Sequence, residues 1–147
     1  MVSERQSHKL VFKDIASTNI HFCNEADTVS VIARKMRDFW IDAIFVKNDK
    51  GEVTGIITDG IIWNLIAKEK DPTDPRYLKA KNIMFKNFIR VQLDAPIESI
   101  EQLCELLKKT KIQRIGLVKD GRIVGIVRED LIERIKRYSR TFSFSLK

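Results

Sequence analysis

Two groups of polar side chains in this sequence could bind an anionic ligand. Thr58 and Asp59 directly follow one short apolar run, and Arg128 and Asp130 follow another. Each group stands where a helix is expected to begin, and the backbone amides of a helix start favour anions. Arg114 lies just before a further apolar run, and its forked guanidinium suits the oxygens of a phosphate. The two arginines could therefore contact an anion, and the hydroxyl and carboxylates could accept hydrogen bonds from a polar ligand.

Each of these residues also has a purely structural role open to it. Thr58 could cap the helix that follows it, since Thr accepts hydrogen bonds from first-turn amides. Asp130, like Glu129, could be a first-turn carboxylate that the helix dipole favours. Arg114 could be a solvated strand residue, although its place between Gln113 and a buried run favours a cleft. Both interpretations stay open at this point.

The sequence offers no catalytic site and no metal site. It has no Gly-rich phosphate loop, no pair of histidines at metal-ligand spacing and no nucleophile motif placed beside a base. His21 and Cys23 would share one face of a strand, but a metal ion would need two further ligands. We therefore expect a protein that is not an enzyme, with no catalytic residue, no metal ligand and no required cofactor.

The elements that must position the polar residues occur twice, about 70 residues apart. Apolar residues at helical spacing appear in both copies: Val29, Ile32, Ala33 and Met36, and 71 residues later Ile100, Leu103, Cys104 and Leu107. Thr28 and Ser99 precede these helices and can accept hydrogen bonds from their first amides. We expect two helices that each bury one face.

Two short apolar runs follow each helix and are typical of a buried hairpin. They are AIFV (43–46) and VTGII (53–57) in the first copy, and IGLV (115–118) and IVGIV (123–127) in the second. A second helix follows, with Ile61, Ile62 and Leu65 in one copy and Leu131, Ile132 and Ile135 in the other. Each unit is then strand, helix, strand, strand, helix, which is an α/β arrangement of the βαββα type.

Two such units predict one folded pair. The predicted boundaries are 8–69 for repeat 1, 70–78 for a linker with two prolines, 79–138 for repeat 2 and 139–147 for a tail. A unit of about 60 residues buries too little surface to be comfortably stable alone. We therefore expect the two repeats to pack sheet to sheet with pseudo-twofold symmetry.

The doubled unit resembles the CBS domain. The resemblance is carried by GEVTGIIT and GRIVGIV at the ends of the two hairpins, and by DIAS (14–17) and NIMF (82–85) at the head of each repeat. It covers about residues 10–137. In this family the cleft between paired repeats often binds an adenosine compound, and many pairs regulate an enzyme or transporter. The resemblance implies a regulatory module with AMP, ADP or ATP as its ligand.

Each repeat departs from the nucleotide-binding signature of that family, in which Thr or Ser follows a glycine and two hydrophobic residues and precedes an Asp by three positions. Repeat 1 keeps Thr58 but has Ile61 at the Asp position. Repeat 2 has Arg128 in place of the hydroxyl and Asp130 one residue early, and a one-residue deletion would explain both repeats. The resemblance then implies that Asp130 binds ribose and that Arg114 contacts phosphate.

The same resemblance places the adenine base between apolar strand residues of the clefts. The full set of residues expected to contact the ligand is Ile20, Ala43, Phe45, Thr58, Asp59, Ile89, Arg114, Ile115, Leu117, Arg128 and Asp130. The ligand is expected to be a small-molecule nucleotide, and its binding is expected to bias the packing of the repeats for a partner to read.

Charge is unequally shared along the chain. The net charge of +7 combines −2 in residues 1–75 with +9 in residues 76–147, which suggests either a phosphate-bearing small molecule or nucleic acid as a partner. Nucleic-acid binding rests on charge alone and is the least favoured function. The main alternative to ligand sensing is a protein-interaction module in which Phe142, Phe144 and the outer helix faces serve a homodimer.

Location and further partners follow from the rest of the composition. No apolar stretch is long enough to span a membrane, and the first residues lack the apolar core of a signal peptide, so we expect a cytoplasmic protein with no membrane partner. Cys23 and Cys104 lie far apart in apolar stretches and are expected to be buried thiols. A homodimer and an unidentified effector protein are the other expected partners.

Overall fold

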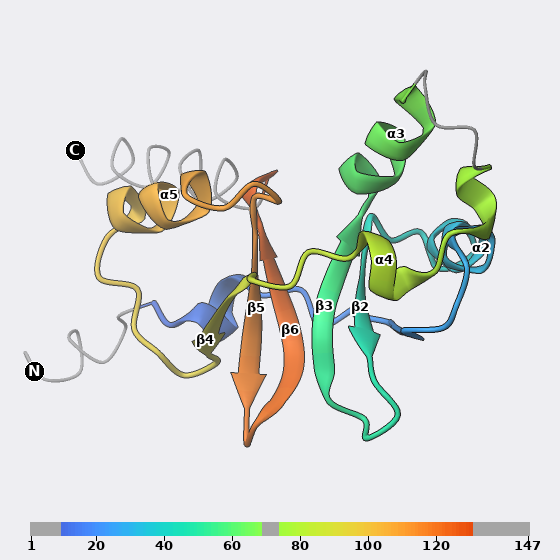
Figure 1. Ribbon diagram of the computed structural model, residues 1–147. Helices are drawn as coiled ribbons and strands as arrows, with labels where there is room; N and C mark the ends of the chain where they lie inside the picture. Colours follow the sequence, from blue (N-terminus) through green and yellow to red (C-terminus); the bar gives the residue numbers. More distant parts are fainter. Residues whose placement is uncertain (1–9, 69–73, 131–147) are drawn as a thin grey trace, which may run out of the picture. The chain divides into compact units, whose positions relative to one another are not determined.

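The computed structural model describes residues 10–68 and 74–130, which fold into two compact units (Figure 1). One unit, Asn19–Phe88, contains the first sequence repeat and is called the repeat 1 unit. The other joins Met1–Thr18 to Ile89–Lys147 and is called the repeat 2 unit. Each unit has a three-stranded sheet of its own.

The sheet of the repeat 1 unit has the strand order β1-β2-β3. The elements of this unit are β1 (Phe22–Asn24), α2 (Val29–Phe39), β2 (Ala43–Lys47), β3 (Val53–Thr58), α3 (Asp59–Ala67), the 3-10 helix η2 (Pro75–Tyr77) and α4 (Ala80–Ile83). Strand β1 runs parallel to β2, and β2 runs antiparallel to β3. The core forms where Ile32 and Met36 of α2 pack with Ile44 and Val46 of β2.

The repeat 2 unit has the same plan. Its elements are η1 (Phe12–Ile15), β4 (Ile89–Gln92), α5 (Ile100–Lys108), β5 (Arg114–Lys119) and β6 (Arg122–Arg128). Strand β4 runs parallel to β5, and β5 runs antiparallel to β6. The α/β class and the doubled sheet predicted from the sequence are confirmed. The predicted second helix of repeat 2, with Leu131, Ile132 and Ile135, lies outside the described residues.

Both predicted helix caps are present. The Thr28 hydroxyl accepts a hydrogen bond from the Val31 amide at 3.4 Å, and the Ser99 hydroxyl accepts one from the Gln102 amide at 3.0 Å. Each cap satisfies one of the amides that a first helical turn leaves without a partner inside the helix. The sequence therefore fixes where α2 and α5 begin.

The buried stripe of each helix is narrower than predicted. Ala33 is exposed, and Cys104 at the matching position of α5 is only half-buried. The reason is geometric, because each residue of a helix is turned by about 100° from the one before it. Ile32 lies at the centre of the buried stripe, and Ala33 therefore lies at its edge. Cys23 is buried as predicted, and both cysteines are free thiols.

Each sequence repeat begins with a short segment, called its head segment, at residues 14–17 in repeat 1 and 82–85 in repeat 2. Each head segment pairs with the sheet of the other repeat. Ser17 exchanges two backbone hydrogen bonds with Ile126 of β6, at 2.9 and 3.0 Å. Phe85 exchanges two with Ile56 of β3, at 2.9 and 3.0 Å. The compact units therefore cross the repeat boundaries of the sequence, because the first head segment belongs to the repeat 2 unit and the second to the repeat 1 unit.

Gly55 and Gly125, which match each other at an offset of 70 residues, allow this exchange. A Cβ atom at Gly55 would lie 2.6 Å from the sulfur of Met84, and one at Gly125 would lie 3.2 Å from the Ser17 carbonyl oxygen. Gly55 leaves no room for a Cβ atom without a shift of Met84, and at Gly125 the Ser17 carbonyl would have to move by a few tenths of an ångström, because the incoming segment approaches the strand backbone directly.

Candidate functional site

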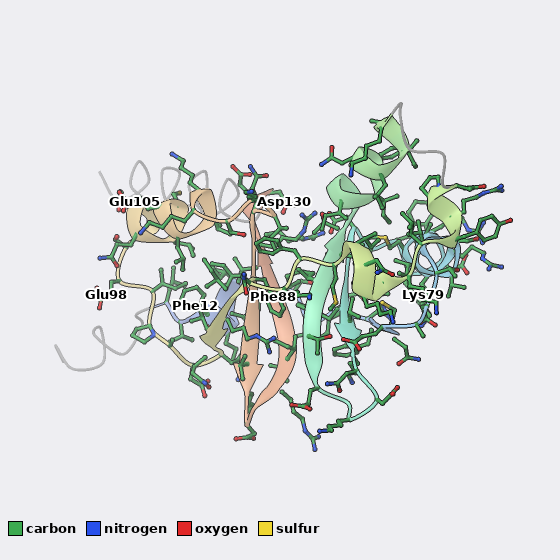
Figure 2. The ribbon with its side chains drawn as sticks, viewed as in Figure 1. Phe12, Lys79, Phe88, Glu98, Glu105 and Asp130 are labelled. Carbon is green, nitrogen blue, oxygen red and sulfur yellow. The ribbon has the colours of Figure 1, made fainter. Side chains whose placement is uncertain are left out.

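Two arginines oppose each other at the open end of the repeat 2 hairpin. Arg114 begins β5, Arg128 ends β6, and the two are Cα partners in the antiparallel register. Asp130 follows at the end of β6 (Figure 2), with Oδ1 3.7 Å from Nε of Arg128. Like charges placed directly opposite each other destabilise a sheet. An anion within reach of both guanidinium groups would remove that repulsion and gain charge-assisted hydrogen bonds.

The turn before β5 fixes the Arg114 side chain. Its Nη1 donates a hydrogen bond to the Ile112 carbonyl oxygen at 2.9 Å. The Ile112 amide in turn donates to the Thr110 hydroxyl at 3.3 Å, and Gln113 has a left-handed backbone with φ of 54°. The Nε atoms of both Arg114 and Arg128 are buried. These guanidinium groups are therefore held at the protein surface and do not extend freely into solvent.

Strand alternation separates the arginines from three residues predicted to contact the base. Ile115 and Leu117 are fully buried in the core beside α5, and Ile89 packs against the same cluster. Successive strand residues point to opposite faces, so Arg114 lies on the other face of the sheet. Ile115 and Leu117 are thus part of the buried core, and Ile89 is half-buried against it.

The matching position of repeat 1 carries no cation. Ala43 is the Cα partner of Thr58 there, as Arg114 is of Arg128. The Thr58 hydroxyl accepts a hydrogen bond from the Ile61 amide at 3.3 Å, and the residue is only 3% exposed. Thr58 therefore caps α3, which is the structural role that the sequence left open. Asp59 is exposed, and its Oδ1 accepts a hydrogen bond from the Gly60 amide at 2.8 Å.

Aromatic rings fill the corresponding face of the repeat 1 sheet. The ring of Phe45 is buried, with its centroid 6.1 Å from that of Phe22 and 5.6 Å from that of Phe88, which Figure 2 labels. Ile20 lies just before β1 and is half-buried, as is Ala43. Of the three predicted base contacts of repeat 1, Phe45 therefore packs against protein rings.

Comparison with known proteins decides the family. The family model for the CBS domain matches residues 12–62 and 80–137. The uncharacterized protein YlbB of Bacillus subtilis is 30% identical over 117 residues, which are 78% of this chain and 74% of YlbB. This chain is a CBS-domain protein. Its two matched segments confirm the resemblance that the doubled sequence carries.

Further relatives extend the likeness along most of the CBS pair. Hypoxic response protein 1 of Mycobacterium tuberculosis is 26% identical over 124 residues, which are 83% of this chain and 82% of that protein. The CBS domain pair of the protein MJ0100, crystallised with 5′-methylthioadenosine and S-adenosyl-L-methionine, has a TM-score of 0.73 at 23% identity and covers 89% of this chain and 98% of its own. At that identity the likeness shows the shared fold.

The His21 and Cys23 region of the CBS pair holds packed side chains. The His21 ring stacks on Phe39 with centroids 4.1 Å apart, and its Nε2 is 3.2 Å from Oδ1 of Asn19. Burial, together with the nearby Asp27 carboxylate, raises the pKa of the Cys23 thiol to about 12. Within residues 10–68 and 74–130, no three His, Cys, Asp or Glu side chains form a group able to hold a metal ion.

In the same ranges, no helix is long and apolar enough to cross a membrane.

Sequence reasoning missed two features of this CBS pair. The first is the opposition of Arg114 and Arg128, both of which were named but not paired. Counting outward from the turn would have suggested it, although a register shift between Leu117 and Val118 obscures the count. The second is the aromatic cluster, because Phe88 is distant in sequence from Phe45 and no local pattern links the two rings.

Proposed function

We propose that this CBS pair is a regulatory module that binds an adenosine nucleotide and has no catalytic activity of its own. The opposed side chains of Arg114 and Arg128 carry the proposal, since they would hold the phosphate oxygens. Asp130 would accept hydrogen bonds from the ribose hydroxyls. The crystallisation of the MJ0100 CBS pair with two adenosine compounds supports an adenosine ligand for the same fold.

Regulation would begin at β6. Arg128 lies two residues beyond Ile126, and Ile126 pairs with Ser17 of the head segment. An anion that draws the two arginines together would tighten the end of β6 next to this pairing. A ligand changes a conformational equilibrium only by binding one state more tightly. The state with ordered β6 and docked head segment would be favoured, and an effector protein in the cytoplasm would read it.

The test is thermal unfolding of the protein with AMP, ADP, ATP, 5′-methylthioadenosine, S-adenosylmethionine or a short DNA duplex. A ligand that prefers the folded state must raise the midpoint as its concentration rises. We expect a rise with an adenosine nucleotide, and loss of that rise in Arg114→Ala and Asp130→Ala. No shift with any adenosine compound at saturating concentration would refute the proposal. A rise with DNA alone that falls steeply with salt would favour nucleic-acid binding instead.

A second function, self-association, is favoured by helix α3. Six of its nine residues are apolar, yet none is buried, and Trp63 and Ile66 are 65% and 59% exposed. A helix that is apolar on most sides normally packs against something. An apolar groove of about 320 Å³ lies beside it, lined by Val29, Ser30, Ala33, Arg34, Arg37, Ile62, Ile66, Pro75 and Arg76.

The rim of this groove suits a second copy of the chain. Arg37 pairs with Asp38 at 3.0 Å and Arg76 pairs with Asp74 at 2.7 Å, and the hydrogen bond from Arg76 holds the pKa of the Asp74 carboxyl below its usual value. A twofold contact brings the same patch together twice, so a rim with both signs of charge is complementary to itself.

Sedimentation at several protein concentrations tests self-association. Ile66→Asp should shift the chain toward monomer, because it places a charge on the apolar surface. Asn64→Asp adds the same charge to the same helix without removing an apolar side chain, and it should have a smaller effect. A wild-type chain that stays monomeric at all concentrations would refute this second function and leave nucleotide binding untouched.

A further inference from the structure

We propose that repeat 2 alone takes the phosphate-bearing ligand, one per chain, and that it selects phosphorylated adenosine compounds over uncharged or cationic ones. This inference rests on the proposed function and narrows it. Three features of the molecule support it: the unequal charge of the two matching hairpin ends, the fixed position of the cations and the different filling of the two sheet faces.

The two hairpin ends match in register and differ in chemistry. Repeat 2 pairs Arg114 with Arg128, and repeat 1 pairs Ala43 with Thr58 at the corresponding rung. The Thr58 hydroxyl accepts a hydrogen bond from the Ile61 amide, and the residue after Thr58 is the acidic Asp59. Among the paired and neighbouring residues that the structure describes at the repeat 1 end, a phosphate would therefore meet the Asp59 carboxylate and no guanidinium.

The sheet face that carries the opposed arginines in repeat 2 also differs from the matching face in repeat 1. The residue of β5 that matches Phe45 is Gly116, so repeat 2 has no side chain where repeat 1 has a buried phenyl ring. In repeat 1 that ring packs between Phe22 and Phe88. The face that carries the opposed arginines is thus the one without this aromatic cluster.

Asp130 increases the preference of this site for ligands with two or more negative charges. Its carboxylate lies 3.7 Å from Nε of Arg128, so a bound anion must compete with it for one of the two cations. A phosphate that carries two or more negative charges contacts both arginines and outweighs this competition. 5′-Methylthioadenosine has no phosphate, and S-adenosylmethionine carries a cationic sulfonium that the two arginines repel. The site therefore favours ADP or ATP over either sulfur compound.

Isothermal titration of the full chain with ADP, adenosine, 5′-methylthioadenosine and inorganic triphosphate tests this inference. We expect one ADP per chain, bound at least about tenfold more tightly than adenosine. Arg114→Gln and Arg128→Gln should each weaken ADP binding by about ten- to a hundredfold, the range for a charged hydrogen bond, and leave adenosine binding unchanged. Arg122→Gln removes the same charge at the far end of β6 and should change neither affinity.

The outcomes separate this inference from the function on which it rests. Two ADP per chain, or adenosine and 5′-methylthioadenosine bound as tightly as ADP, would overturn the inference while nucleotide sensing survives. Binding of triphosphate with no binding of any adenosine compound would keep a phosphate site in repeat 2 and overturn nucleotide sensing. Equal loss of ADP affinity in Arg122→Gln would show a general charge effect and overturn the assignment to the opposed pair. No binding of any of the four compounds would overturn this inference, and the unfolding test with AMP, ATP and S-adenosylmethionine would then decide nucleotide sensing.

Discussion

Gly55 of β3 and Met84 of the second head segment approach so closely that a Cβ atom at Gly55 would lie 2.6 Å from the Met84 sulfur and 2.9 Å from its Cβ. The contact occurs where Phe85 pairs with Ile56. The methionine backbone would have to move to admit even a methyl group, because its Cβ atom cannot swing away. The segment and the strand are therefore fitted to each other at this glycine.

Gly55→Ala should lower the free energy of unfolding by about 1–3 kcal/mol, the usual effect of overpacking. Urea unfolding of the variant and the wild type measures it. Gly60→Ala is the matched control, since a Cβ atom there meets nothing closer than 3.7 Å and the residue lies in α3. It should leave stability unchanged or raise it by up to about 1 kcal/mol. Equal stability of both variants would contradict the close fit at Gly55.

Gly125→Ala should lower the free energy of unfolding less than Gly55→Ala does, and it should weaken the pair of hydrogen bonds between Ser17 and Ile126. Its Cβ atom would lie 3.2 Å from the Ser17 carbonyl oxygen, which accepts the Ile126 amide. A shift of a few tenths of an ångström would lengthen that bond. Hydrogen exchange should therefore speed up at the Ile126 and Ser17 amides before the global stability falls. Unchanged exchange at both amides would show that the head segment does not depend on the glycine.

Removing one of the opposed arginines should stabilise the protein when no ligand is bound. Arg128→Gln keeps most of the side-chain stem and removes the repulsion from Arg114, a gain of a few tenths to about 1 kcal/mol. Loss of the Arg128–Asp130 pair subtracts little, since partly exposed pairs contribute little. Urea unfolding at low and high salt should show the gain shrinking as salt screens the repulsion. A salt-independent loss of stability would contradict it.

The sequence predicts the helices and strands of this fold better than it predicts which of them pack together. Local patterns predict helices α2 and α5, their caps and both hairpins. The pattern is an apolar face that repeats every 3.6 residues for a helix, and a glycine-containing turn between two apolar runs for a hairpin. An unbroken apolar run such as residues 115–118 has no alternation, so the sequence could not say that Ile115 and Leu117 face the core. The exchange of head segments depends on contacts between distant residues such as Ser17 and Ile126, for which no local pattern exists.

The stability of the repeat 1 unit should fall at alkaline pH because of Cys23. Burial raises the pKa of this thiol from 9.0 to about 12 in the folded chain. Between these values the unfolded chain releases the proton and the folded chain keeps it, so stability is full below about pH 9 and declines toward pH 12. The decline from one proton is about 1.4 kcal/mol per pH unit. Cys23→Ala should make the fall of unfolding free energy with pH shallower by that amount, and an unchanged slope in this variant would contradict the assignment to Cys23.

Trp40 ends α2 in a strained and solvent-exposed conformation. Its backbone is left-handed, with φ of 53° and ψ of 44°, and its side chain is 93% exposed. The left-handed region costs a residue with a Cβ atom about 1 kcal/mol, and glycine adopts it freely. Trp40→Gly should therefore raise the free energy of unfolding by about 1 kcal/mol, because an exposed ring loses no burial when it is removed.

Asp120→Gly is the control for this backbone effect. Asp120 is also left-handed, with φ of 52°, but Asp tolerates that region better than Trp, so the gain there should be smaller. Urea unfolding at low protein concentration, where chains do not associate, measures both variants. A loss of stability in Trp40→Gly under these conditions would mean that the indole ring packs against its own chain, in contradiction to its exposure. A loss that appears only at high protein concentration would instead place Trp40 in a contact between copies.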